Sequence, residues 1–249
     1  MSGQTDSSLF TSFLDRETDR CGFISAWLRA RDVPHSIVTL GDKKHIVVKY
    51  ENSAYDPRFR MKTLIAHYDR APDTPGANDN SAACFQLMAL AERLLSFRQG
   101  AVSHNIRIIF TDGEEAAGTG GISGQGSFVL GTGLKKLKRT DDDIYVFDAC
   151  GCGDTLILST AGIPASAKKP VSGTLFSRIE RLHERAAALA VETSPENWVR
   201  LPTPYSDNAG FIAAGLPAQV ITLLPGKKPA PFFSRSNQGE TEIQEKRKY

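Results

Sequence analysis

Three apolar runs in this 249-residue chain predict buried strands, and each run ends abruptly at residues that can bind a metal ion. The runs and the residues that follow them are residues 61–66 with His67, residues 105–111 with Glu114 and Glu115, and residues 144–147 with Asp148. In an open, mainly parallel sheet, the carboxyl ends of the strands line one crevice. We therefore expect an α/β fold that brings these side chains together.

Helical patterns alternate with the strands, as an α/β fold requires. Apolar residues recur at three- and four-residue intervals over residues 8–30, 80–98 and 172–191. No linker rich in Pro, Gly or Ser divides the chain, so we expect one domain over residues 1–224. Residues 225–249 are rich in Pro, Lys and Glu, and we expect an irregular or disordered tail there.

Composition restricts the class of partner. Thirty Lys and Arg residues oppose 28 Asp and Glu residues, and a net charge of +2 argues against binding to nucleic acid or to an anionic membrane. No run approaches the ~18 apolar residues of a membrane span, and no signal peptide is visible. The four cysteines form no CxxC pair, which favours a reducing, cytoplasmic setting. A small-molecule or peptide ligand is therefore the expected partner.

The acidic residues at the strand ends predict a site for one or two divalent ions. Asp79 lies on the loop after His67 and adds a further carboxylate. Several carboxylates in one crevice repel one another unless cations neutralise them. Imidazole and carboxylates without thiolate suit catalytic Zn²⁺, with manganese or cobalt as substitutes. Hydrolysis is then the natural reaction, because one glutamate of the pair can bind metal while the other accepts a proton from metal-bound water.

The ordered set of these motifs resembles a known family. The chain is similar to the zinc-dependent aminopeptidases of the co-catalytic di-zinc type, whose fold glutaminyl cyclases share. The resemblance covers roughly residues 60–224. It is carried by Ala66-His67-Tyr68-Asp69, Gly76-Ala77-Asn78-Asp79-Asn80-Ser81, Asp112-Gly113-Glu114-Glu115, Phe147-Asp148, Ser206-Asp207-Asn208-x-x-Phe211 and Gly215-Leu216-Pro217-Ala218.

The resemblance implies a ligand set for two zinc ions. His67 and Asp148 would hold one ion, Glu115 would hold the other, and Asp79 would bridge the two. It also implies a three-layer α/β sandwich, in which helices cover both faces of a mixed, mainly parallel sheet. The activity it implies is removal of N-terminal residues from peptides.

Two further roles follow from the same resemblance. Glu114 would be the general base that activates the attacking water. Asp69 would be the carboxylate that orients the imidazole of His67.

The chain departs from the family pattern at two positions. The family has a histidine after the last strand, as the final ligand of the Glu115 ion, but no histidine follows Leu224 here. Asn208 also stands where the family commonly has the histidine of Ser-Asp-His. Three explanations are open: the tail is truncated or frameshifted, only the His67 ion binds well, or Asp207 or a carboxylate of the tail substitutes.

Three functions therefore remain in view. The first is an aminopeptidase. The second is a glutaminyl cyclase-like transferase, in which zinc polarises a side-chain amide and no water attacks. The third is a non-catalytic relative that acts as a binding or partner protein, which the missing final ligand favours.

The other features carry no chemistry in this interpretation. We expect His45 to be a partly buried or solvated structural residue, His183 to lie at the surface or flank of its helix, and His104 to lie at the opposite end of the sheet from the site. The glycines of residues 118–133 fit neither GxGxxG nor GxxxxGK[ST], so a short helix near residues 127–130 is expected there in place of a nucleotide loop.

Overall fold

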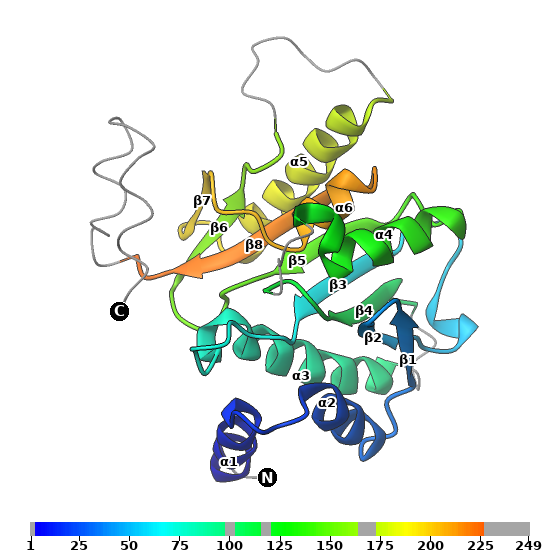
Figure 1. Ribbon diagram of the computed structural model, residues 1–249. Helices are drawn as coiled ribbons and strands as arrows, with labels where there is room; N and C mark the ends of the chain where they lie inside the picture. Colours follow the sequence, from blue (N-terminus) through cyan, green and yellow to red (C-terminus); the bar gives the residue numbers. More distant parts are fainter. Residues whose placement is uncertain (1–2, 98–102, 116–120, 164–172, 227–249) are drawn as a thin grey trace.

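A mixed eight-stranded sheet forms the centre of the molecule (Figure 1). The computed structural model describes residues 3–97, 103–115, 121–163 and 173–226. The strand order is β1-β2-β4-β3-β5-β8-β6-β7. The strands are β1 (His35–Leu40), β2 (Lys43–Val48), β3 (Lys62–His67), β4 (Ile106–Thr111), β5 (Asp143–Phe147), β6 (Thr155–Ser159), β7 (Trp198–Leu201) and β8 (Ala218–Leu224).

The four central strands β4, β3, β5 and β8 run parallel, while β1, β2 and β6 introduce antiparallel pairs. Parallel neighbours need a crossover, and the intervening helices provide it. The helices are α1 (Gly3–Leu14), α2 (Arg20–Arg29), α3 (Ala82–Ser96), α4 (Gly126–Lys136), α5 (Leu175–Thr193) and α6 (Asn208–Ala213), with shorter helical turns at Asn52–Ala54, Ala77–Ser81 and Gly121–Gly124.

Helices cover both faces of the sheet because its central strands are apolar on both faces. Ile65 packs with residues of α4 and α6, whereas its neighbour Ala66 packs with residues of α2 and α3. Helix α5 packs on the same face as α3, where Leu64 and Phe147 contact both groups. The expected three-layer α/β sandwich is confirmed, with α1, α2 and α3 below the sheet and α4 and α6 above it in Figure 1.

Several expectations need correction. Helix α4 is longer than the short helix expected near residues 127–130, and β7 was not expected. His183 is not a surface residue, because α5 packs it against the sheet. Its side chain is buried and its Nδ1 lies 2.9 Å from Gln219 Oε1 on β8. His45 is completely buried, and its Nε2 has no hydrogen-bond partner.

His104 lies away from the site, as expected. His104 precedes β4 and packs edge-on against Tyr50, away from the strand ends that carry the acidic residues. The tail from residue 227 onward falls outside the described residues. Among the helices in the described part of the chain, none is long and apolar enough to cross a membrane.

Candidate metal centre

His67, the last residue of β3, is completely buried, and its two ring nitrogens face different carboxylates. Nδ1 lies 3.3 Å from the backbone oxygen of Asp69 and 3.5 Å from its Oδ1. Nε2 lies 3.1 Å from Asp79 Oδ1 and 3.7 Å from Asp148 Oδ1. Burial lowers the pKa of His67, but the hydrogen-bonding carboxylates outweigh burial and raise that pKa well above its ordinary value. A positive charge is therefore strongly favoured among these three carboxylates.

The sheet register brings Asp148 to His67. Ile65 on β3 is paired with Val146 on the parallel strand β5, so a step of two residues along each strand aligns His67 with Asp148. The backbone N–H of Asp148 donates to Ile221 of β8, 3.1 Å away, which continues the ladder to the end of the strand. The buried apolar strands thus fix where these two side chains stand.

Two asparagines hold the loop that carries Asp79 against the end of β5. Asn80 Nδ2 donates to the backbone oxygen of Phe147 at 2.8 Å. Asn78 Oδ1 accepts the backbone N–H of Gly151 at 2.8 Å. Asp79 lies between these two ties. The side-chain amides of the two asparagines therefore set the position of the Asp79 carboxylate. In the sequence, the only indication of this role is that an asparagine stands on each side of Asp79.

The three side chains form a donor set that fits a divalent cation. One ligand atom from each of His67, Asp79 and Asp148 lies within 4.8 Å of the others, and no other such group of three or more occurs among the described residues. His67 Nε2 and Asp148 Oδ1 are both buried and have no hydrogen-bond partner. Buried polar atoms without partners are costly. One nitrogen and two carboxylate oxygens are ligands that catalytic zinc accepts.

Asp69 links His67 to the turn after β4. Its Oδ1 accepts the backbone N–H of Glu114 at 3.2 Å, and its Oδ2 accepts that of Glu115 at 2.9 Å. Burial raises the pKa of Asp69, but the interaction with His67 and these two N–H groups outweigh it, and the net pKa is lowered. Asp69 therefore carries a charge that holds the imidazole and the two glutamates in one arrangement.

The two glutamates differ in their surroundings. Burial, together with the charges of Asp207 and Asp148, raises the pKa of Glu114 to about 8, although His67 opposes the shift. Burial, followed by the charge of Asp79, also raises the pKa of Glu115. Glu114 therefore experiences the field of Asp207, and Glu115 experiences chiefly that of Asp79. Both glutamates therefore lie in a partly buried, acidic setting, where one carboxyl can exchange a proton and the other can contact a metal.

Asp207, which precedes α6, is a buried member of the site that sequence reasoning considered only as a substitute ligand. It is completely buried, and its Oδ2 accepts the hydroxyl of Thr111 at the end of β4. Burial raises the pKa of Asp207 to about 6. Its Oδ1 has no hydrogen-bond partner. The only sequence signal for its burial is the apolar helix that follows it.

The six predicted residues lie in one region, but only three of them form the compact ligand group, namely His67, Asp79 and Asp148. Asp69 lies beside His67 and accepts the backbone N–H groups of Glu114 and Glu115, which belong to the turn after β4. Glu115 is not a member of the three-ligand group. No histidine follows Leu224 in the sequence to complete a second set.

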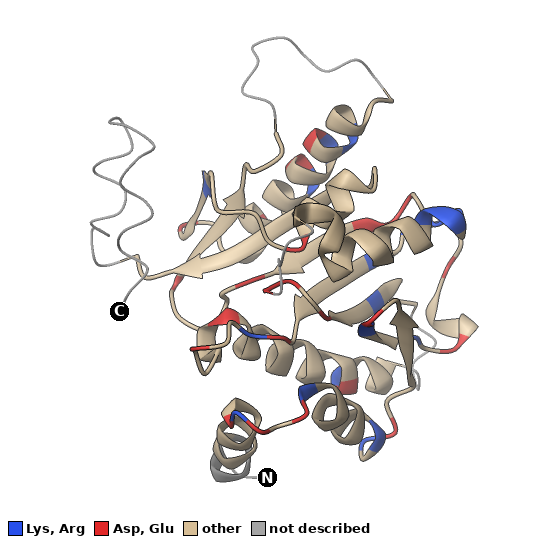
Figure 2. Cartoon of the chain, viewed as in Figure 1, with Lys and Arg blue, Asp and Glu red and all other residues tan. Residues whose placement is uncertain are grey.

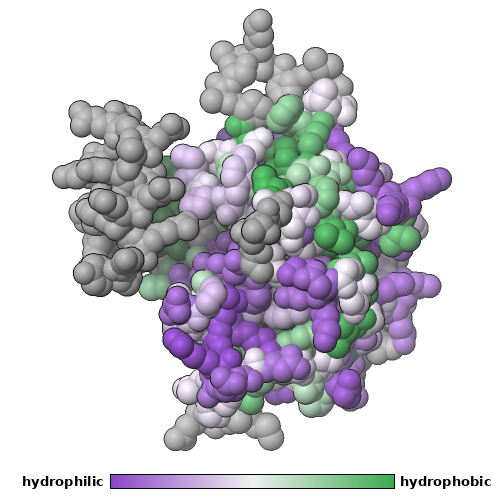
Figure 3. Space-filling model, in the orientation of Figure 1, coloured by the Kyte–Doolittle hydropathy of each residue, from purple (hydrophilic) through white to green (hydrophobic). Residues whose placement is uncertain are grey.

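The acidic residues gather at one edge of the sheet. Figure 2 shows acidic segments in the loops between the sheet and the start of α3. In the view of Figure 3, the surface around these loops is largely hydrophilic, whereas hydrophobic residues gather above it over α4 and α5. The loops that carry the acidic residues are therefore surrounded by a hydrophilic surface in this view.

Comparison with known families gives one match. The model of peptidase family M28 matches residues 45–243, which is most of the chain and includes all six predicted site residues. No curated protein sequence is significantly similar to the chain.

Solved structures share the fold at low sequence identity. The LapA aminopeptidase of Legionella pneumophila has a TM-score of 0.63 and 17% identity, and the match covers 88% of this chain and 60% of LapA. The glutaminyl cyclase of Porphyromonas gingivalis has a TM-score of 0.56 and 17% identity, with 92% and 85% covered. The glutaminyl cyclase of an Acidobacteriales bacterium has a TM-score of 0.52 and 17% identity, with 80% and 68% covered. This chain therefore spans less than two thirds of the length of LapA.

Proposed function

Because this chain belongs to peptidase family M28, we propose that it is a metal-dependent aminopeptidase, which hydrolyses the peptide bond after the first residue of a peptide. The observation that carries the proposal is the cluster of His67 Nε2, Asp79 Oδ1 and Asp148 Oδ1: the buried nitrogen lies 3.1 Å and 3.7 Å from the two carboxylate oxygens, and neither it nor Asp148 Oδ1 makes a hydrogen bond of good geometry. A hydrolase site needs such a donor set next to a proton acceptor, and Glu114 supplies the acceptor.

The residues that would hold the metal are those of the compact group. His67, Asp79 and Asp148 would hold one zinc ion. By the resemblance to di-zinc aminopeptidases, Asp79 and Glu115 would hold a second ion. When bound, zinc supplies Lewis acidity, which polarises the scissile carbonyl and acidifies the attacking water. The protein's own side chains carry out the proton transfer and hold the site in place.

Glu114 is the proton acceptor in this proposal. Its carboxylate takes a proton from the attacking water and passes it to the departing amine. The pKa of about 8 that burial gives Glu114 falls when a cation binds nearby, which leaves the carboxylate ionised at neutral pH. Asp69 keeps the backbone of Glu114 and the ring of His67 in place through the hydrogen bonds described above.

The acidic surroundings of the metal centre favour a substrate with a free amino terminus. The side chain of Asp79 is 55% exposed, while that of Asp148 is 21% exposed. The negative charge on the exposed side of the centre attracts a protonated α-amino group. A peptide N-terminus fits this field better than an internal peptide bond does, which supports an exopeptidase. We further propose a cytoplasmic protein, since all four cysteines are free thiols.

The test combines metal content with activity. The purified chain, loaded with zinc and dialysed, is analysed by elemental mass spectrometry and assayed on a panel of aminoacyl-p-nitroanilides. We expect at least one zinc per chain and release of p-nitroaniline. His67→Ala abolishes both, whereas His104→Ala, which alters a histidine outside the site, leaves both near the wild-type level. A zinc-loaded chain that releases no N-terminal residue from any substrate refutes the aminopeptidase.

Glutaminyl cyclisation is the second candidate, because this chain spans 85% of the P. gingivalis glutaminyl cyclase but only 60% of LapA. A peptide with N-terminal glutamine separates the two reactions. Loss of one ammonia without shortening of the peptide indicates cyclisation. Absence of both reactions in a zinc-loaded chain supports the third candidate, a non-catalytic binding protein.

A further inference from the structure

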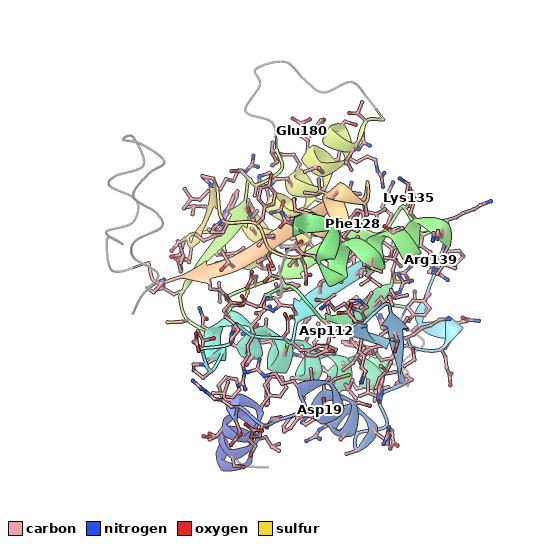
Figure 4. All side chains as sticks on the ribbon, in the orientation of Figure 1. Asp19, Asp112, Phe128, Lys135, Arg139 and Glu180 are labelled. Carbon is pink, nitrogen blue, oxygen red and sulfur yellow. The ribbon has the colours of Figure 1, made fainter. Side chains whose placement is uncertain are left out.

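The two N-terminal helices pack beside the loop that carries the metal-binding residues. Helices α1 and α2 precede residue 45, where the match to the family model begins. Figure 1 shows both helices on the α3 side of the sheet, and Figure 4 labels Asp19 at the start of α2 and Asp112 at the end of β4. Asp19 caps α2 by accepting the backbone N–H of Gly22 at 3.0 Å. The cap therefore fixes the position of Arg20, the first residue of α2.

Arg20 bridges the two ends of the loop between β3 and α3. Its Nη1 donates to the backbone oxygen of Tyr68 at 3.0 Å, and its Nη2 donates to that of Pro75 at 2.8 Å. Arg20 is only 6% exposed, and its guanidinium carbon lies 4.7 Å from the centre of the Phe13 ring. A planar guanidinium presents several donors in a fixed fork, which allows one side chain to hold two carbonyls at once.

A second arginine ties the same loop to α1. Arg70 Nη1 donates to the backbone oxygen of Leu14, the last residue of α1, at 2.7 Å. Burial and the charge of Arg70 lower the pKa of Arg20 to about 10, so Arg20 stays protonated at neutral pH. Two like charges are therefore held near one another by backbone oxygens from the loop and from α1. Such an arrangement is costly unless the oxygens stay in place.

The bridged loop positions both sides of the metal centre. Asp69 directly follows Tyr68 and holds His67, Glu114 and Glu115. Beyond Pro75, the backbone oxygen of Gly76 accepts both the N–H and the hydroxyl of Ser81, at 3.0 and 2.6 Å, and these bonds enclose the turn with Asp79. A shift at either end of the loop therefore moves a carboxylate that faces His67.

We propose that Arg20 is a positioning residue for the metal centre: it fixes the loop from Tyr68 to Pro75 and thereby sets Asp69 and Asp79 relative to His67. The inference rests on the proposed function only in that the centre binds zinc. It gives the N-terminal helices a role in metal affinity in addition to their contribution to the core.

Arg31 provides a matched control. It belongs to the same region of the molecule, directly after α2, and it also stacks on an aromatic ring, with its guanidinium carbon 3.8 Å from the centre of the Trp27 ring. It forms an ion pair with Glu92 of α3 at 3.3 Å, and its side chain is 31% exposed. In the described part of the chain, the ion pair, ring contact and hydrogen bond of Arg31 are made with Glu92 and Trp27, outside the loop from Tyr68 to Pro75. Loss of Arg31 therefore removes a comparable aromatic and ionic contact without touching the metal centre.

The experiment measures zinc affinity and loop exchange separately. Arg20→Met, Arg20→Lys and Arg31→Met are prepared in the full chain, and zinc dissociation constants are measured by competition with a chromophoric chelator, well below each melting temperature. Partners that orient metal ligands contribute about 10- to 100-fold in affinity. We expect Arg20→Met to weaken zinc binding by about that factor, Arg20→Lys to weaken it less, and Arg31→Met to stay within about twofold of the wild type.

Hydrogen exchange of the metal-free chain gives the second readout. If the bridge holds the loop, the amides of residues 69–71, 73 and 74 exchange faster in Arg20→Met than in the wild type or Arg31→Met. If Arg20→Met fails to fold, Arg20→Lys decides, because a single ammonium keeps the charge but lacks the fork.

Three results overturn the inference. A folded Arg20 variant with wild-type zinc affinity shows that the bridge does not position the ligands. An equal loss of affinity in Arg31→Met shows a general structural effect. Unchanged loop exchange in the Arg20 variants removes the mechanism. A wild-type chain that binds no zinc refutes the proposed metal function instead, and faster loop exchange in Arg20→Met then still supports the bridge.

Discussion

The carboxylate of Asp69 accepts the backbone N–H of Glu115 at 2.9 Å, so the loop after β3 and the turn after β4 are joined at one side chain. The same residue lies against the Nδ1 side of His67. The adjacent parallel strands β3 and β4 end in register, with His67 paired to Thr111, and this pairing allows one short carboxylate to reach both. The geometry of the centre therefore depends on Asp69 as much as on the residues that face a metal.

Asp69→Asn should weaken zinc binding while the fold persists. The Glu114 and Glu115 N–H groups bond to different oxygens of Asp69, and in asparagine one of these oxygens becomes an NH2 group that faces an N–H donor, so one bond is lost. The substitution also removes a charge beside His67. We expect zinc affinity to fall by about 10- to 100-fold. The measurement is the chelator competition described above. Asp56→Asn is the control, since Asp56 accepts the backbone N–H of Arg58 outside the site. Wild-type affinity in Asp69→Asn would contradict the role.

Glu114→Gln should separate catalysis from metal binding. The amide cannot take a proton from the attacking water, and general-base catalysis is typically worth about 10²- to 10⁴-fold. We expect kcat to fall by that factor and zinc content to stay near the wild-type level, because Glu114 is not part of the three-ligand group. Steady-state kinetics and elemental analysis check the two halves. Near-normal turnover in a zinc-loaded variant rules out the base assignment.

The strand ends of the site could be predicted because buried parallel strands leave a strong sequence signal. Continuous apolar runs mark β3, β4 and β5, and their ends mark the crevice.

The burial of His183 was also present in the pattern. Ile179, Leu182, Ala186 and Ala190 define an apolar stripe on α5, and position 183 is the i+4 neighbour of Ile179. The charged residues next to His183 made an exposed position the expected one. In the structure, Gln219 on β8 is the hydrogen-bond partner of the buried His183.

The remaining parts depend on contacts between distant segments. Arg20 and Tyr68 are 48 positions apart, and nothing in the local sequence indicates that an arginine at the start of a helix will bind a loop beyond three strands. Asp207 and Thr111 are 96 positions apart. Strand β7 is short, and its burial pattern lacks a fully buried residue, so its signal is weak. Such features follow from the packing of the folded chain rather than from periodicity.

The stability of the protein should fall in mild acid because of His45. Burial lowers the pKa of His45 in the folded chain below the ordinary value of 6.5. The unfolded chain then binds the proton more readily, so the contribution of His45 is complete above about pH 6.5 and is lost as the pH falls through the folded pKa. One group can change the free energy of unfolding by at most about 1.4 kcal/mol per pH unit.

The measurement compares urea unfolding of the wild type and His45→Gln at pH 7.5 and 5.5. We expect the wild type to lose more stability than the variant over this range. His35→Gln is the control, because His35 is only partly buried and hydrogen bonds to Ser25 and Val33. An identical pH dependence in the wild type and His45→Gln would show that His45 does not titrate between the two states.

Gly76→Ala should disturb the turn that carries Asp79. Gly76 has a φ of +62°, and a Cβ there would lie 2.8 Å from the backbone oxygen of Asp79 and 2.9 Å from Cβ of Arg70. Gly41 is a close control, since its φ is +64° and a Cβ there would meet no atom within 4 Å. Both alanine variants carry the left-handed backbone cost of about 1–2 kcal/mol, but only Gly76→Ala adds the steric contact with the metal loop. We therefore expect both variants to have a lower free energy of unfolding, with the larger loss in Gly76→Ala.

Only Gly76→Ala should lose zinc affinity, because the displaced oxygen belongs to Asp79, which faces His67. Thermal unfolding of the metal-free chain measures the first effect and chelator competition the second. Equal zinc affinity in the two variants would show that the turn adapts without moving the Asp79 carboxylate.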